Sequence, residues 1–567
     1  MSYPARTHAH SEATRLLCAG VRLNSAFRQR VIDELIGHAE RPVPPSLGVD
    51  LRPVLAHALQ ARRQEVRTAL ALLGVWAAFF VVSLVVTYDM MDDLSGGNWE
   101  FSFDALLALV PAFEDPALGS ESLLATVWVV QYVFVVLALW AGRALSGRRT
   151  VVYDVGREDR WQIRSRARRW LGRLVTYVAR VFALWYWFGA LGGVDDNPFP
   201  VIFPLLLAGV VWLHRIRMAT VLREQLGRRT FHSSPLPELP VGARYRAVGE
   251  AIDREQHAQA AMYDPNRPFV GAGTPYKPWS FALELRRKKD LDGGGVPHQG
   301  ESGLSSRQVI DMITPRLVAL REAAARTSRD RLRELEVEEF VYLPSGAPRD
   351  GGVYGPESVH AHLGDAVDEG AEARRHFLRI RVGAWEEQVV VSLFVRVHTQ
   401  GGMLVLEVVP HVLGPVAEEF REVDAMVESR AAGPLREGFL ALLTAPAVTA
   451  AAGIAAMRTL FSVCRVWLAA PEYAAPDAPL LSVRELASTP ELSLFQEMDV
   501  SRYIKTVQDR IAGGVRDALE QRGFRTDRFE QQIVNVRDGG VFIKEISGGT
   551  VATGEHGQAH HVEGSPK

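Results

Sequence analysis

Cysteine is nearly absent from this sequence. Its 567 residues include only Cys18 and Cys464, which are far apart in the chain. Two isolated cysteines exclude a disulfide framework and a cysteine-based zinc site. Lysine is also rare, with 6 residues against 58 arginines, a ratio that indicates the codon bias of a GC-rich genome.

Recognisable targeting and catalytic motifs are missing as well. The first 30 residues contain no apolar stretch followed by a cleavage site, so we expect no secretory signal peptide. Zincin, nucleophile-elbow and protein-kinase motifs do not occur in the sequence. We therefore expect no metal site, no cofactor and no assignable catalytic residue.

The near-zero net charge of the chain conceals two oppositely charged parts. Residues 1–234 contain 26 basic and 20 acidic residues, hence +6, and the remainder contains 38 basic and 46 acidic residues, hence −8. A net-negative second part argues against nucleic-acid binding, because neutralising phosphates needs clustered arginine and lysine. The basic surplus of the first part fits a membrane with anionic headgroups.

Four apolar segments in the first part are long enough, or nearly so, to cross a bilayer as helices: 68–87, 123–142, 175–192 and 199–213. Residues 88–122 carry eight acidic residues and no Lys or Arg, whereas the segment from Arg143 to Arg173 carries ten arginines against three acids. Basic flanks stay on the cytoplasmic side. We therefore predict a multi-pass protein of the cytoplasmic membrane with both termini cytoplasmic, and anionic lipid headgroups as partners of the arginine-rich segment.

Two polar residues fall inside these segments, Arg180 and Gln131. An ionisable residue within a span is a candidate functional site, but Arg180 is near enough to the cytoplasmic end to snorkel to the headgroups. For Gln131 we favour a hydrogen bond between helices over a role in binding substrate. A fifth apolar stretch, 445–470, contains Arg458 and Arg465 on one helical face, and we interpret it as a buried or surface-packed helix.

The whole chain divides into five regions. We predict N-terminal cytoplasmic helices over 1–67, four transmembrane helices over 68–215, a basic and proline-rich linker over 216–240, a cytoplasmic α+β domain over 241–535 and a flexible glycine-rich tail over 536–567. Alternating apolar residues predict three strands, 377–382, 389–398 and 403–411, whose glycine-containing turns favour an antiparallel meander. We expect Asp499 to cap a final long helix.

Two weak candidates for ligand binding lie in the α+β domain. The polar face of the predicted meander carries Arg379, Arg381, Arg396 and His398, which could hold an anion, although cross-strand ion pairs on a solvated face are commoner. A second candidate is the loop with Gly271, Gly273 and Lys277, because glycine-rich turns can expose backbone N–H groups to phosphate. Its spacing matches no known phosphate-binding motif, so we favour a structural turn.

Several stretches resemble a known protein family. They are TRLLCAG at 14–20, VPPSLGVD at 43–50, RPFVGAG at 267–273 and the four apolar segments. Together they resemble an uncharacterised family of actinobacterial multi-pass membrane proteins with no assigned activity. The resemblance implies the same topology and a soluble domain, and it transfers no catalytic residue.

From these features we expect a non-enzymatic membrane protein whose large cytoplasmic domain senses or scaffolds by binding a ligand or a partner. The partner would be another protein or a second copy of the chain. A membrane-anchored enzyme acting on an anionic substrate is the first alternative. A transporter or a subunit of an oligomeric pore, resting on Arg180 and Gln131, is the second.

Overall fold

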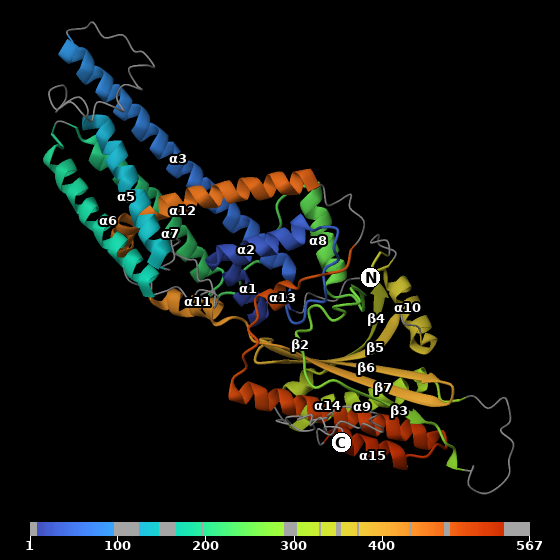
Figure 1. The fold of residues 1–567 in the computed structure, drawn as a ribbon. Helices are drawn as coiled ribbons and strands as arrows, with labels where there is room; N and C mark the ends of the chain where they lie inside the picture. Colours follow the sequence, from blue (N-terminus) through green and yellow to red (C-terminus); the bar gives the residue numbers. More distant parts are fainter. Residues whose placement is uncertain are drawn as a thin grey trace, which may run out of the picture.

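The structure is a computed structural model that describes residues 8–95, 124–146, 166–195, 197–288, 303–327, 330–346, 353–370, 373–429, 434–469 and 477–537. It is mostly helical, with a helical bundle at one end and a sheet domain at the other (Figure 1). Most of the arginine-rich segment and the predicted tail from residue 538 onward lie outside the described residues.

Among the described residues, five helices are long and apolar enough to cross a membrane. They are α3 (Leu51–Ser95), α5 (Leu124–Ser146), α6 (Arg166–Gly192), α7 (Phe199–Glu224) and α12 (Pro434–Ala469). All five contribute to one buried apolar cluster, the bundle core, which includes Phe79, Val135, Tyr186, Leu207 and Ala445. Their outer faces expose large apolar side chains such as Leu184 and Phe188, as expected of helices that face lipid.

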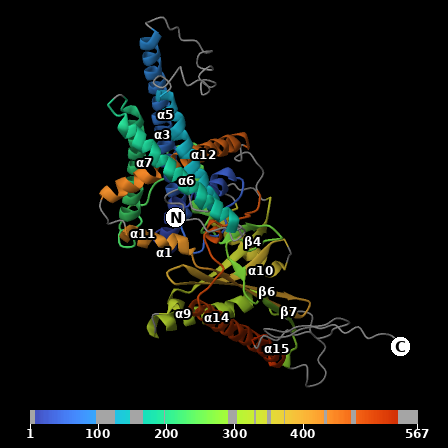
Figure 2. The same cartoon turned by 60° about the vertical axis from the view of Figure 1, so that its left-hand side comes forward.

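The helix α12 contains most of the stretch 445–470, which we interpreted as a buried or surface-packed helix. By length and composition it is a fifth candidate span, so these criteria do not confirm the count of four. Figures 1 and 2 show, however, that α12 runs across the other bundle helices rather than alongside them. Its Ala441, Ala445 and Ala447 belong to the bundle core, because alanines let a crossing helix approach closely.

A layer of shorter helices lies between the bundle and the sheet (Figure 1). It comprises α1 (Glu12–Leu23), α2 (Ser25–Ile32), the π-helix η1 (Asp33–Gly37), α8 (Ala243–Glu255), α11 (Glu418–Ser429) and α13 (Val483–Leu486). The side chains of Ser11 and Asn24 cap α1 and α2 by accepting backbone N–H bonds from Thr14 and Phe27.

This layer and the bundle share two continuous helices. A second apolar cluster, the helical core, contains Leu17, Val21 and Phe420 from the short helices. It also contains Val54 and Leu55 from the first turns of α3, and Met218 and Leu222 from the last turns of α7. Helices α3 and α7 therefore connect the bundle to the layer without a break.

The seven-stranded sheet is mixed and curled (Figure 1). Its strands are β1 (Ala260–Tyr263), β2 (Thr274–Pro275), β3 (Trp279–Glu284), β4 (Glu336–Pro344), β5 (Arg375–Ala384), β6 (Val389–Gln400) and β7 (Met403–Leu413). They follow the order β1-β4-β5-β6-β7-β2, with β3 also paired to β7. The pairs from β4 to β7 are antiparallel, but β1 pairs parallel to β4, so the domain is not a simple antiparallel meander.

The two faces of the sheet have different coverings. One packs on α9 (Ser306–Thr327), α14 (Leu494–Gln521) and α15 (Asp527–Arg537) around a sheet core that includes Ile380, Leu393 and Leu406. The apolar residues that alternate along the three predicted strands all belong to this core and so share one face of the sheet: Leu378, Ile380, Val382, Val391, Leu393, Val395, Leu404, Leu406 and Val408. The other face carries an aromatic cluster with Phe340 and Phe394 and turns toward the short helices. Helix α10 (Pro356–Glu369) packs on β1 and β4 and also contacts α9.

The contact between α1 and α11 gives a stability prediction. A Cβ added at Gly20 would lie 2.8 Å from ring atoms of Phe420, closer than two such atoms pack. We expect Gly20→Ala to lower the free energy of unfolding by about 1–3 kcal/mol, measured by thermal or chemical denaturation of the full chain.

The matched control is Gly364→Ala in α10, where an added Cβ meets nothing within 4 Å. Replacing an unhindered helical glycine by alanine should raise stability by about 0.5–1 kcal/mol. Equal responses of the two variants would contradict close packing of α1 on α11.

Candidate functional site

The basic residues predicted on the sheet face are neutralised by the chain itself. Glu338 on β4 accepts a hydrogen bond from Arg379 at 2.6 Å, and the Arg379 guanidinium stacks on the Phe340 ring at 4.6 Å. Glu407 on β7 lies 3.5 Å from Arg396. Carboxylates from neighbouring strands therefore occupy positions that an external anion would otherwise take.

His398 does not join the arginines in one site. Its Nε2 lies 3.1 Å from the side-chain oxygen of Gln400, and its ring packs against Gly370 at the end of α10. Arg379 and Arg381 are next-but-one neighbours on β5 and pair with residues of β4, whereas Arg396 and His398 are next-but-one neighbours on β6.

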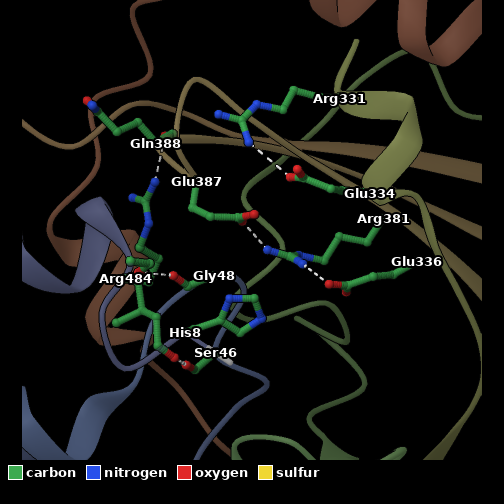
Figure 3. A network of polar contacts seen from close by, with 12 residues as sticks. His8, Ser46, Gly48, Arg331, Glu334, Glu336, Arg381, Glu387, Gln388 and Arg484 are labelled. Carbon is green, nitrogen blue, oxygen red and sulfur yellow. Dashed lines mark hydrogen bonds and ion pairs between the residues drawn. The ribbon is translucent and has the colours of Figure 1, made fainter. Parts of the chain in front are cut away.

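Arg381 is the centre of a buried polar network (Figure 3). The residue is only 3% exposed, and its guanidinium donates to Glu336 at 2.6 Å and to Glu387. Although burial opposes the charge, these two carboxylates raise the pKa of Arg381. Burial likewise disfavours the Glu336 carboxylate, yet Arg381 lowers its pKa below the usual range. For Glu387 burial dominates and raises the pKa.

A strained turn brings Glu387 into this network. Trp385, Glu386 and Glu387, between β5 and β6, have φ values of 53°, 58° and 66°, a left-handed conformation that is rare for residues with a side chain. The turn folds the Glu387 carboxylate back over Gly383, where any Cβ would collide with it. Gly48, with φ of 76°, leaves room on the other side of the same carboxylate.

Arg484 from α13 lies beside the network and is less well satisfied (Figure 3). It is 1% exposed, and its Nη2 donates to the carbonyl oxygens of Gln388 at 2.7 Å and Gly414 at 3.0 Å. Its Nε and Nη1 find no hydrogen-bond partner in the described part of the chain. Burial therefore lowers the pKa of Arg484 to about 10, in spite of the nearby Glu387.

His8, in the N-terminal segment, lies beside the network (Figure 3). Burial, together with the charge of Arg381, lowers the pKa of His8 to about 4, so this imidazole is neutral at pH 7. Its ring lies 6.3 Å from that of His257. Asp50, fully buried, accepts from the backbone of Arg52 at 3.0 Å and from the amide of Gln256 at 3.2 Å.

The loop with Gly271 and Gly273 binds the carboxylate of Glu485, a residue of the same chain. The backbone N–H groups of Gly271 and Gly273 donate to one oxygen of Glu485 at 2.8 and 2.9 Å. Both glycines have positive φ, 97° and 91°, which turns the two N–H groups toward the same point. Lys277 lies beyond β2 and is exposed, with its ammonium group 5.8 Å from the Tyr276 ring.

The polar residues predicted inside the bundle lie in different environments. Arg180 is exposed on the outer surface of α6. Gln131 on α5 is partly buried, and its side-chain oxygen has no hydrogen-bond partner in the described ranges. The two residues therefore do not form one site. Elsewhere in the described ranges, no group of three or more His, Cys, Asp or Glu side chains is placed to hold a metal ion.

Four residues that the sequence analysis did not select organise the site: Glu336, Glu387, Arg484 and Glu485. The strand β4 was not predicted, although Glu336, Glu338 and Phe340 alternate in it as strand residues do. Register then pairs Glu336 with Arg381 and Glu338 with Arg379. The other two carboxylates come from a turn and a one-turn helix, which leave no periodic signal.

Comparison with known proteins identifies one family resemblance. Residues 278–552 match the family model described as AbeC-like domain, which is less than half of the chain. The match includes Glu336, Arg381, Glu387 and Arg484, whereas His8 and Gly48, which lie beside them, and Asp50 are outside it. No curated protein and no solved structure matches the chain.

Removing the carboxylate from the glycine loop should be costly. In Glu485→Ala the N–H groups of Gly271 and Gly273 lose their acceptor, and each unsatisfied donor costs about 1–3 kcal/mol. We expect a clear fall in the melting temperature of the full chain. Glu250→Ala, an exposed position on α8, serves as control and should change it little. A Glu485→Ala variant as stable as this control would show that the loop does not depend on its internal anion.

Proposed function

We propose that the chain is a multi-pass protein of the cytoplasmic membrane in which α3, α5, α6 and α7 cross the bilayer and both termini are cytoplasmic. The charge asymmetry between 88–122 and 143–173 supports this orientation. In this topology the layer of short helices and the sheet domain are cytoplasmic.

The contacts at the two ends of α12 support four spans rather than five. Gly438, near its start, lies against Trp212, one residue before the end of the last predicted apolar segment. Near its other end Ser462 and Arg465 contact Asp33 of η1 at 3.1 and 3.3 Å. Both ends therefore return to the same side of the bundle, as in a helix that lies across the inner leaflet.

For the function, we propose that the cytoplasmic domain binds a ligand or a protein partner and that the spans hold it in a set orientation at the membrane, so that the protein acts as a sensor or scaffold without chemistry of its own. The observation that carries this proposal is the helical core, in which α3 and α7 share buried contacts with α11 and α13. Because packed cores transmit small displacements rather than absorb them, binding at the sheet domain can shift the spans.

A membrane-anchored enzyme acting on an anionic substrate is the second candidate. One observation favours it: two guanidinium nitrogens of the buried Arg484 lack partners among the described residues. Such a cation could bind a substrate phosphate or carboxylate if the strained turn at Trp385 opened.

Cysteine accessibility tests the topology. In a background of Cys18→Ala and Cys464→Ala, we expect Ser102→Cys and Ser120→Cys to react with a membrane-impermeant thiol reagent in intact cells. Ser146→Cys and Ser305→Cys should react only after permeabilisation. Labelling of Ser305→Cys in intact cells would refute the cytoplasmic assignment.

The proposed function is tested by asking whether a ligand binds to the protein without being consumed. The full-length protein in nanodiscs is incubated with panels of nucleotides, sugar phosphates and carboxylates, and both its melting temperature and the composition of each panel are measured. We expect a ligand that raises the melting temperature, remains unconsumed and slows hydrogen exchange in the first turns of α3 and last turns of α7.

Two results would count against this proposal. Consumption of a panel compound that disappears in Arg484→Gln would favour the enzyme. Binding that leaves hydrogen exchange in α3 and α7 unchanged would contradict coupling through the helical core.

A further inference from the structure

An apolar groove lies between α5 and α12 and is not used by the proposed binding domain. Its volume is about 430 Å³, and its walls include Leu137 and Trp140 of α5 and Ile454, Met457 and Phe461 of α12. Arg458 is the one charged residue among the described residues that line it. An apolar wall with one cation is complementary to an amphiphile whose head is negative.

Arg458 is available for such a head. Its side chain is exposed and has no ion pair or hydrogen bond with the described residues. The other arginine on the same face of α12, Arg465, is instead paired with Asp33 at 3.3 Å. A guanidinium that is free and flanked by apolar side chains is suited to bidentate binding of a phosphate group.

In the proposed topology, the groove lies at the depth of the lipid headgroups. On α12 it falls between the alanines of the bundle core and Ser462, which contacts η1 in the layer of short helices. On α5 it includes Trp140, close to the end that precedes the arginine-rich segment, and tryptophan is typical of the membrane interface.

A glycine keeps the groove open. A Cβ added at Gly453 meets nothing within 4 Å, so the space beside this position is empty. The neighbouring Met457 and Phe461 are 57% and 69% exposed, which makes the groove continuous with the apolar outer surface of the bundle. An acyl chain can therefore enter it sideways from the bilayer.

We propose that this groove is a binding site for an anionic phospholipid, with the acyl chain along Met457 and Phe461 and the phosphate on Arg458. The bound lipid would contact both α12 and α5 at the inner leaflet and so hold the two helices together. This inference rests on the proposed membrane topology, but not on what the sheet domain binds.

The full-length protein is placed in nanodiscs of equimolar phosphatidylglycerol and phosphatidylcholine. The protein is then released from the nanodiscs, and the lipids that remain bound to it are identified by native mass spectrometry. We expect retention of phosphatidylglycerol in preference to phosphatidylcholine. Arg458→Gln should weaken this retention about tenfold or more, because it removes a charged hydrogen-bond donor. Gly453→Leu should abolish it by filling the groove, while leucine also favours the helix.

Matched controls address general effects of charge and bulk. Arg217→Gln removes an exposed arginine from α7, and Gly209→Leu adds a side chain at another helical glycine with nothing within 4 Å. Both should retain lipid as the unaltered chain does. Equal retention of the two lipids, or undiminished retention in Gly453→Leu, would overturn the site. Failure of the protein to enter nanodiscs at all would instead overturn the membrane topology on which the site rests.

Discussion

Apolar burial in the helical core is the interaction on which the rest of the structure depends. The first turns of α3 and the last turns of α7 bury side chains there against α1, α11 and α13, which come from distant parts of the chain. Because α3 and α7 continue without a break into the bundle core, one set of contacts sets the positions of both the bundle and the sheet domain. A gap in this core would separate the two parts as well as lower stability.

Carboxylates of the chain itself neutralise most of the basic groups on the polar face of the sheet domain. Two features of this domain could bind an anionic ligand: the β5 arginines and the loop with Gly271 and Gly273. They bind the carboxylates of Glu336, Glu338, Glu387 and Glu485 instead. Such pairs contribute little net stability relative to apolar packing, but they link β4 to β5 and α13 to the loop with Gly271 and Gly273. Arg484, with two unpartnered nitrogens in the described chain, is the exception that makes this face a candidate for chemistry.

Local pattern predicted some elements well and others poorly. Alternation along the predicted strands identified the inward faces of β5, β6 and β7. The predicted final long helix corresponds to α14, whose Val500, Ile504, Val507, Ile511 and Val515 belong to the sheet core. The expected cap at Asp499 was wrong, because α14 begins at Leu494 with a capping box formed by Ser493 and Gln496. Strand β4 was missed because its first half is rich in glutamate, which ordinarily disfavours strands.

The sequence by itself determined the long apolar helices, the alternating strand faces and the charge asymmetry around the apolar segments, because each depends on periodicity or composition within one segment. Only the tertiary structure decided that α12 crosses the bundle, that β1 pairs parallel to β4, and that Glu387 and Glu485 occupy the anion-binding positions. These features join residues up to hundreds of positions apart, so local patterns contain no information about which partner each group will find.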